Sequence, residues 1–134
     1  MKTSKIKYAG ELRTECTHLK SGKTFVTDAP TDNNGKGEAF SPTDTVATAL
    51  GCCMITIMGI VAEKNNFELG HCKADITKVM ESNPRRIGEV IVELHLAEGN
   101  FSAEQKKILE TAALNCPVAK SLHPDLKQTV TFKY

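Results

Sequence analysis

The sequence predicts an α+β fold, from the order of its hydrophobic patterns and from one long apolar helix. Stretches rich in β-branched and aromatic residues precede this helix, and two further strands, two shorter helices and a last strand follow it. This order is typical of helices packed on antiparallel strands. A length of 134 residues suits one domain, so residues 1–134 are predicted to form a single domain.

The first part of the chain is predicted to form a small antiparallel meander. Residues 4–9, 11–19 and 24–27 have the composition of strands, with turns expected near Ala9-Gly10 and within 20–23. Residues 28–39 are rich in Asp, Asn, Gly and Pro, and they are predicted to form a loop.

The central helix is predicted to begin near Ser41, with Pro42 in its first turn, and to end at Asn65-Asn66. Apolar residues recur along it at steps of three and four, namely Val46, Leu50, Cys53, Met54, Ile57, Met58 and Val61. A helix of roughly 24 residues is about 36 Å long. Because that is long for a chain of this size, the helix should run through the middle of the fold.

The second part of the chain returns to strands and then to shorter helices. Residues 71–81 and 86–97 are predicted strands, and the capping-box pattern of residues 102–105 begins a helix. A short helix is expected from Pro117, and residues 129–132 are predicted to form the closing strand.

Composition excludes several classes of partner. Formal net charge is +1 with acids and bases interspersed, which argues against a nucleic-acid interface. The apolar stretch 46–62 contains threonines and glycines and is shorter than the about 20 apolar residues of a membrane span, so no membrane partner is expected. No secretory leader pattern follows the basic N-terminus, and we expect a cytoplasmic protein whose five cysteines are thiols.

Cys53 and Cys116 are the candidate reactive residues. Pro117 fits the first position of a helix, which leaves Cys116 as the cap, where the positive end of the helix dipole favours a thiolate. Cys53 lies on the apolar stripe of the central helix and could equally be a small buried hydrophobe. A structural role is open for Cys116 too, and it is the prediction for the other cysteines, Cys16, Cys52 and Cys72.

No metal or cofactor is predicted. The chain lacks C-x₂-C, H-x₃₋₅-H and H-E-x-x-H patterns, and its four histidines are scattered. Gly35-Lys36-Gly37 matches no phosphate-binding pattern. A cysteine–histidine nucleophile stays open on spacing alone, although no local signature supports it.

In this order, Ser41-Pro42-Thr43-Asp44, the helix with Cys53 and the later Cys116-Pro117-Val118 resemble the OsmC/Ohr family of thiol-dependent hydroperoxide reductases. The resemblance covers nearly the whole chain. It implies an intertwined homodimer with strands wrapped around long central helices and paired active sites at the interface. An apolar helix and a lean core without tryptophan agree with such a dimer.

The resemblance also implies a mechanism. Cys53 would attack an organic hydroperoxide, with hydrogen peroxide as a further candidate, and its sulfenic acid would form a disulfide with Cys116 that an external thiol or dithiol reduces. Because apolar surroundings disfavour a thiolate, a cation is required near Cys53. Arg13 matches the family's arginine, and Asp44 is its expected carboxylate partner, with Glu38 as the alternative. Arg13 could also be an ordinary surface residue of its strand.

Two other functions stay open. The departure of Thr43 from the family's Asn-Pro-Glu pattern, together with the apolar helix, suits a module that binds a small molecule or an acyl chain. A thiol redox sensor could use the same two cysteines with slow turnover. The preferred peroxide and the reductant are not readable from the residues.

Overall fold

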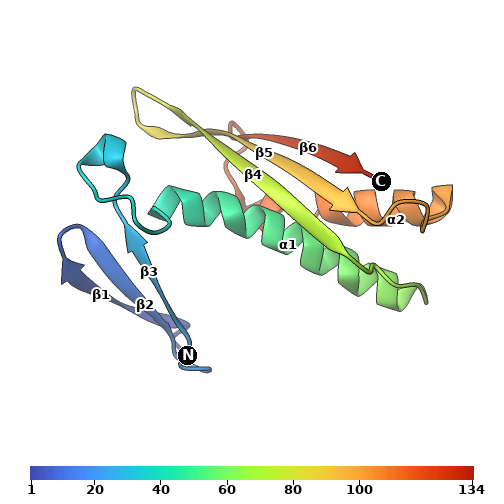
Figure 1. Ribbon diagram of the computed structural model, residues 1–134, viewed down its shortest axis with the longest axis horizontal. Helices are drawn as coiled ribbons and strands as arrows, with labels where there is room; N and C mark the ends of the chain where they lie inside the picture. The colour runs from blue at the N-terminus through green and yellow to red at the C-terminus, as the bar shows by residue number, and fades with distance from the viewer. The chain divides into compact units, whose positions relative to one another are not determined.

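The structure is a computed structural model that describes residues 1–134. It contains two compact units, Met1–Val46 and Ala47–Tyr134, and each has a three-stranded sheet (Figure 1). The second unit also contains helices, although its long helix, α1, begins in the first unit. The predicted α+β class is confirmed, whereas the single domain over residues 1–134 stays a prediction.

The first unit is the predicted meander. Strands β1 (Ser4–Gly10), β2 (Arg13–His18) and β3 (Thr24–Asp28) are antiparallel in the order β1-β2-β3, and a short 3₁₀ turn, η1, covers Thr31–Asn33. The first turn lies at Glu11-Leu12, after the predicted Ala9-Gly10, and both residues have positive φ, 54° and 63°. A two-residue turn with positive φ matches the twist of paired strands, which outweighs the poor turn preference of leucine.

One face of the first unit's sheet carries apolar side chains next to one another. Ile6 lies opposite Cys16, and Cys16 lies opposite Phe25. Ile6 is 69% exposed and Phe25 is 53% exposed, because the core cluster of the chain consists of residues from Ala47 onward. This sheet therefore has an apolar face without a core of its own.

Helix α1 (Pro42–Lys64) begins and ends where the sequence predicts. The amide of Asp44 donates to Ser41 Oγ at 3.0 Å, and the amide of Ser41 donates to an Asp44 carboxylate oxygen at 3.0 Å. These two bonds form a reciprocal capping box that satisfies amides at the helix start. Asn66 adopts φ 60°, a left-handed conformation that ends the helix.

By length and composition, α1 is apolar enough to cross a membrane, contrary to the prediction from the stretch 46–62. The core helix of a globular protein passes the same test, so one such helix is weak evidence for a span. Its inward residues are part of the hydrophobic core, namely Ala47, Leu50, Met54, Met58 and Ala62.

The second unit packs its helices on one face of a sheet. Strands β4 (Cys72–Glu81), β5 (Arg86–Leu96) and β6 (Lys127–Lys133) are in the order β4-β5-β6, and α2 (Ala103–Leu114) and α3 (Pro117–Ser121) connect β5 to β6. Alternate residues of β5 are fully buried, Val90, Val92 and Leu94, and they join the core with residues of α1 and α2. This alternation is the predicted pattern of a half-buried strand.

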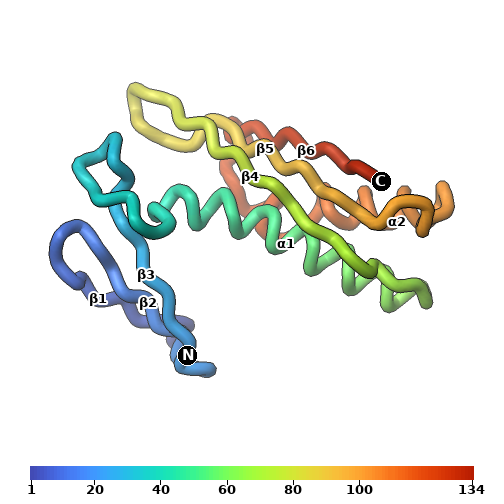
Figure 2. Tube along the Cα trace, viewed as in Figure 1, coloured from blue at the N-terminus to red at the C-terminus, as the bar shows by residue number.

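The prediction that all strands are antiparallel is wrong for β6, which pairs in parallel with β5. The arrows of the two strands point the same way in Figure 1, and the tube of Figure 2 follows the connection between them. A chain that leaves a strand, passes through helices and returns to the starting end must enter the next strand in the same direction. The crossover through α2 and α3 thus sets the direction of β6.

Candidate redox site

Cys116 is the N-cap of α3, as predicted, and it is fully buried. Its backbone is extended, with φ −64° and ψ 155°, and Pro117 occupies the first turn of the helix. The amide of Ala119 donates to Cys116 Sγ at 3.5 Å. Sulfur therefore satisfies an amide that a serine or aspartate caps in most helices.

The structure brings the thiols of Cys53 and Cys116 together. Cys53, on α1, is partly buried and packs against the core cluster that includes Cys116, and it is one of the neighbours that raise the pKa of Cys116. Two cysteines far apart in the sequence are thus neighbours within the second unit.

The pKa of Cys116 is raised, contrary to the expectation that its helix start favours a thiolate. Burial is the main cause, and the neighbouring Cys53 adds to it, whereas the amides of Ala119 and Val118 act in the opposite direction. Burial dominates because α3 has only 5 residues and a short helix has a weak dipole. Cys116 is therefore a protonated thiol at neutral pH.

The other cysteines lack this pairing. All five cysteines are free thiols, and Cys52, next to Cys53 on α1, is exposed. Cys16 contacts the hydroxyl of Thr14 at 3.8 Å, and burial raises the pKa of Cys72. The structural roles of these three residues stay a prediction.

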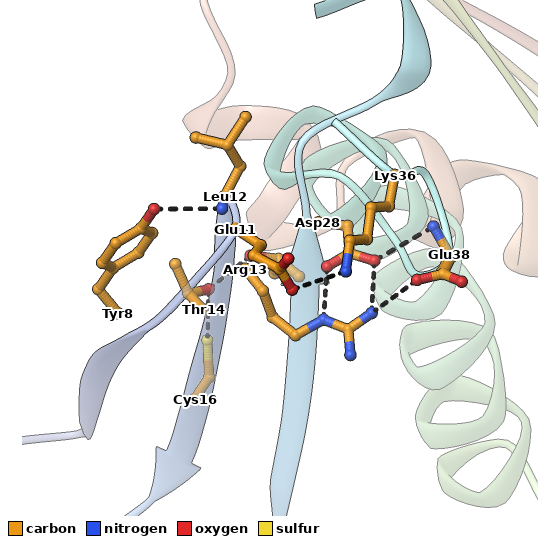
Figure 3. A network of polar contacts seen from close by, with 10 residues as sticks. Tyr8, Glu11, Leu12, Arg13, Thr14, Cys16, Asp28, Lys36 and Glu38 are labelled. Atoms are coloured by element: carbon orange, nitrogen blue, oxygen red, sulfur yellow. Dashed lines mark hydrogen bonds and ion pairs between the residues drawn. The ribbon is translucent and has the colours of Figure 1, made fainter. Parts of the chain in front are cut away.

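In the first unit, Arg13 holds a two-point ion pair with Asp28 (Figure 3). Arg13 Nε donates to Asp28 Oδ1 at 2.7 Å and Nη2 donates to Oδ2 at 2.8 Å. The two residues lie directly opposite one another on β2 and β3. Asp28 is 2% exposed, whereas Arg13 is 37% exposed, so the anion is buried beneath a guanidinium that still reaches the surface.

Each member of this pair keeps its partner ionised. Asp28 raises the pKa of Arg13 further, and Arg13 lowers the pKa of Asp28 below its ordinary value of 3.8. The hydrogen bond from Arg13 is the largest cause of the Asp28 shift, and the amide of Glu38 adds a smaller one. Both groups are therefore charged throughout the physiological pH range.

The loop after β3 closes over the same carboxylate. The amide of Glu38 donates to Asp28 Oδ2 at 3.1 Å, and the amide of Asp28 donates to the carbonyl of Phe40 at 3.0 Å. Inside the loop, a Cβ atom on Gly35 would lie 1.8 Å from the carbonyl oxygen of Ala29. Only glycine fits there, and the loop therefore folds tightly against the end of β3.

The partner of Arg13 differs from the expected one. Asp44 was expected to orient Arg13, but its carboxylate binds the Ser41 amide, and the carboxylate that grips Arg13 is Asp28. Glu38, the alternative, lies 3.6 Å from Arg13 Nη2 and its side chain is 64% exposed. Sequence reasoning missed Asp28 because it assigned this residue to the loop, whereas the observed register extends β3 to Asp28 and pairs it with Arg13.

One group of side chains has ligands that could hold a metal ion, at the surface of the β4–β5 sheet. Single ligand atoms of Asp75, Glu93 and His95 all lie within 4.8 Å of one another. Asp75 contacts His95 at 2.9 Å, and Glu93 contacts Lys133 at 3.0 Å. These are ordinary surface contacts, and Lys133 already neutralises the Glu93 carboxylate.

Comparison with known proteins places the chain in a family. The sequence profile of OsmC-like proteins matches residues 35–131, which is well over half of the chain. The chain therefore belongs to the OsmC-like family. Cys53, Cys116 and Asp44 lie inside the matched residues, whereas Arg13 and Asp28 precede them.

Solved structures share the fold over almost the whole length. A protein of Psychrobacter arcticus, described as an osmotic stress induced and detoxification response protein, is 48% identical with a TM-score of 0.93, covering 98% of this chain and 96% of that one. An organic hydroperoxide resistance protein OsmC of Legionella pneumophila is 14% identical, with a TM-score of 0.78 and coverage of 100% and 98%.

The organic hydroperoxide resistance protein OhrB of Bacillus subtilis is also similar in structure. It is 17% identical, with a TM-score of 0.67 and coverage of 98% of both chains. At this identity the likeness to it, as to the Legionella protein, establishes the fold alone. No curated protein matches the chain.

Proposed function

We propose that this protein is a cysteine-based peroxidase that reduces organic hydroperoxides, with hydrogen peroxide as a further substrate, by a Cys53–Cys116 disulfide cycle. The observation that carries the proposal is the proximity of the two cysteines: Cys53 packs against the core cluster that contains Cys116 and contributes to the raised pKa of its thiol. Family membership and the names of the Legionella and Bacillus proteins support a role with peroxides.

The chemistry follows in three balanced steps. The Cys53 thiolate attacks the distal peroxide oxygen, the O–O bond breaks, and the leaving alkoxide takes a proton to become an alcohol. The Cys53 sulfenic acid then condenses with the Cys116 thiol, which forms the S–S bond and releases water. A dithiol reductant finally attacks the disulfide, restores both thiols and becomes a disulfide itself.

The environment of each sulfur suits its step. Cys116 is a protonated thiol in the resting state, so it does not compete with Cys53 as the nucleophile. Cys116 is fully buried, whereas Cys53 is only partly buried. The accessible sulfur for the external reductant, a thiol or dithiol of unassigned identity, is therefore that of Cys53.

Arg13 is proposed as the cation that stabilises the Cys53 thiolate, as the family resemblance implies. Its guanidinium is fixed in orientation by Asp28, and Nη1 makes no hydrogen bond within the chain. Those free N–H groups are suited to a thiolate or to a peroxide oxygen.

The active assembly is proposed to be a homodimer. The sheet of the first unit has an exposed apolar face with Ile6 and Phe25, and α1 exposes Val46 and Ile60. Burying these residues against a second copy removes them from water. Sedimentation should give twice the 14.6 kDa mass of the chain, and Ile60→Glu should weaken the association. A monomeric parent protein would contradict the dimer.

We place the protein in the cytoplasm, where five free thiols stay reduced.

Stopped-flow kinetics test the peroxidase proposal on the unmodified protein. Mixing reduced protein with cumene hydroperoxide should consume peroxide rapidly, with loss of two thiols for each peroxide reduced. Hydrogen peroxide in the same experiment should react more slowly, because it has no apolar group to remove from water on binding. Unchanged peroxide together with an unchanged thiol count would eliminate the proposed function.

A further inference from the structure

Gln128 is a polar residue at a position of β6 where apolar residues are otherwise found. Its register partner on β5 is Val90, which is fully buried. The next residues of β6 on the same face, Val130 and Phe132, pack against the core cluster. Because alternate residues of a strand share one face of the sheet, Gln128 lies on the core side. A polar side chain in that place needs a hydrogen-bond partner.

The partner of Gln128 is the backbone of α3, the short helix that Cys116 caps. Gln128 Nε2 donates to the carbonyl oxygen of Ala119 at 3.0 Å. Ala119 is buried and lies in the last turn of α3, where carbonyls have no partner within the helix. Gln128 therefore satisfies a carbonyl that the helix itself leaves unpaired.

Ala119 connects Gln128 to the sulfur of Cys116. Its carbonyl accepts from Gln128, and its amide donates to Cys116 Sγ at 3.5 Å. Helix α3 has only 5 residues, and a helix of little more than one turn has few internal bonds to hold it in place. The position of the buried Cys116 thus depends on how α3 is attached to the sheet.

Resting on the peroxidase function proposed above, we propose that Gln128 is a positioning residue for the Cys116 thiol. It ties α3 to β6 and so keeps Cys116 in the core against which Cys53 packs, ready for the disulfide step. In this role Gln128 acts through the backbone of Ala119.

Loss of the Gln128 bond has a definite structural consequence. A buried carbonyl without a partner is costly, so α3 must shift until water or another donor reaches Ala119. Such a shift exposes Cys116 and moves it away from Cys53. The first effect changes the reactivity of Cys116 toward added reagents, and the second slows disulfide formation.

Two substitutions of Gln128 and one matched control separate the hydrogen bond from packing and charge. Gln128→Met removes the donor, keeps the length of the side chain and suits the apolar neighbours. Gln128→Glu keeps the shape, but an ionised carboxylate only accepts hydrogen bonds. Gln105→Glu adds the same charge at the start of α2, where Gln105 Oε1 accepts from the Ser102 amide at 2.9 Å. A carboxylate accepts there equally well, so this control keeps its bond.

The first measurement is alkylation of the reduced, folded protein by iodoacetamide, with each cysteine followed by peptide mass spectrometry. Cys116 should react about tenfold faster in Gln128→Met and Gln128→Glu than in the parent protein, and at the parent rate in Gln105→Glu. Cys72 is the internal reference, because it is partly buried on β4 and packs against the same core. Its rate should not change. An unchanged rate at Cys116, or equal accelerations at Cys116 and Cys72, would overturn the proposal.

The second measurement follows one equivalent of cumene hydroperoxide. Consumption of peroxide by Cys53 should keep its parent rate in Gln128→Met, whereas disulfide formation should slow about tenfold and dimedone should trap more Cys53 sulfenic acid. Disulfide formation at the parent rate, in a variant whose Cys116 alkylates faster, would refute the positioning role. Alkylation needs no peroxide. A parent protein that does not reduce peroxide therefore refutes the proposed function, while the alkylation rates still test the attachment of α3.

Discussion

Cys53→Ser is expected to abolish peroxide turnover, because serine offers no nucleophile able to break the O–O bond at neutral pH. Cys116→Ser should behave differently. Cys53 can still react once, but its sulfenic acid then lacks the buried thiol that stands next to it in the parent protein. Turnover should stop after one equivalent of peroxide, and the sulfenic acid should be trapped by dimedone and detected by mass spectrometry.

Cys52→Ser is the matched control for both variants. Cys52 is the neighbour of Cys53 on α1, yet it is exposed and is not among the residues packed against the core cluster of Cys116, so its replacement should leave turnover within about twofold of the parent. Full activity in Cys53→Ser would show that Cys53 is not the reactive residue. A strong loss of activity in Cys52→Ser, together with an active Cys53→Ser, would assign the chemistry to Cys52 instead.

Arg13→Ala is expected to lower kcat/KM for cumene hydroperoxide by about a hundredfold, which is the scale of losing one preorganised electrostatic group. The kcat/KM of Arg13→Lys should lie between that of the parent protein and that of Arg13→Ala. Lysine restores the positive charge but presents a single ammonium, which cannot make the two bonds that Arg13 makes with Asp28. The acid limb of the pH–rate profile should move to higher pH in both variants.

Arg86→Ala is the control for net charge, because Arg86 is an exposed arginine that binds Glu81 and carbonyls of its own hairpin turn. It removes the same charge from the protein and should leave kcat/KM nearly unchanged. Equal losses in Arg13→Ala and Arg86→Ala would mean that Arg13 acts only through overall charge, and its assigned role would be refuted.

Local signals explain how much of this fold was predictable. The start of α1, the capping box at Ser102 and the cap at Cys116 each depend on a few adjacent residues, and all three are found where the pattern places them. Such motifs satisfy helix amides within one turn, so neighbouring residues alone determine them. The direction of β6 depends on a crossover of about 30 residues, and no local pattern encodes it.

The candidate site shows the same limit. Cys53 and Cys116 were identifiable from their positions on helices, but the raised pKa of Cys116 depends on how deeply the fold buries it. Asp28 was missed because its role comes from the register between β2 and β3, which joins residues of two different strands. Pairing across strands is set by the turn between them, and composition does not report it.

The closure of the loop at Gly35 gives the chain an unusual kind of vulnerability. A single added methyl group there would collide with backbone at Ala29, the neighbour of Asp28, and the collision has no flexible side chain to absorb it. A substitution at this position would thus first disturb the ion pair between Asp28 and Arg13. The helices and the two cysteines of the other unit would stay intact. Reactivity in this protein can be lost through a residue that has no side chain at all.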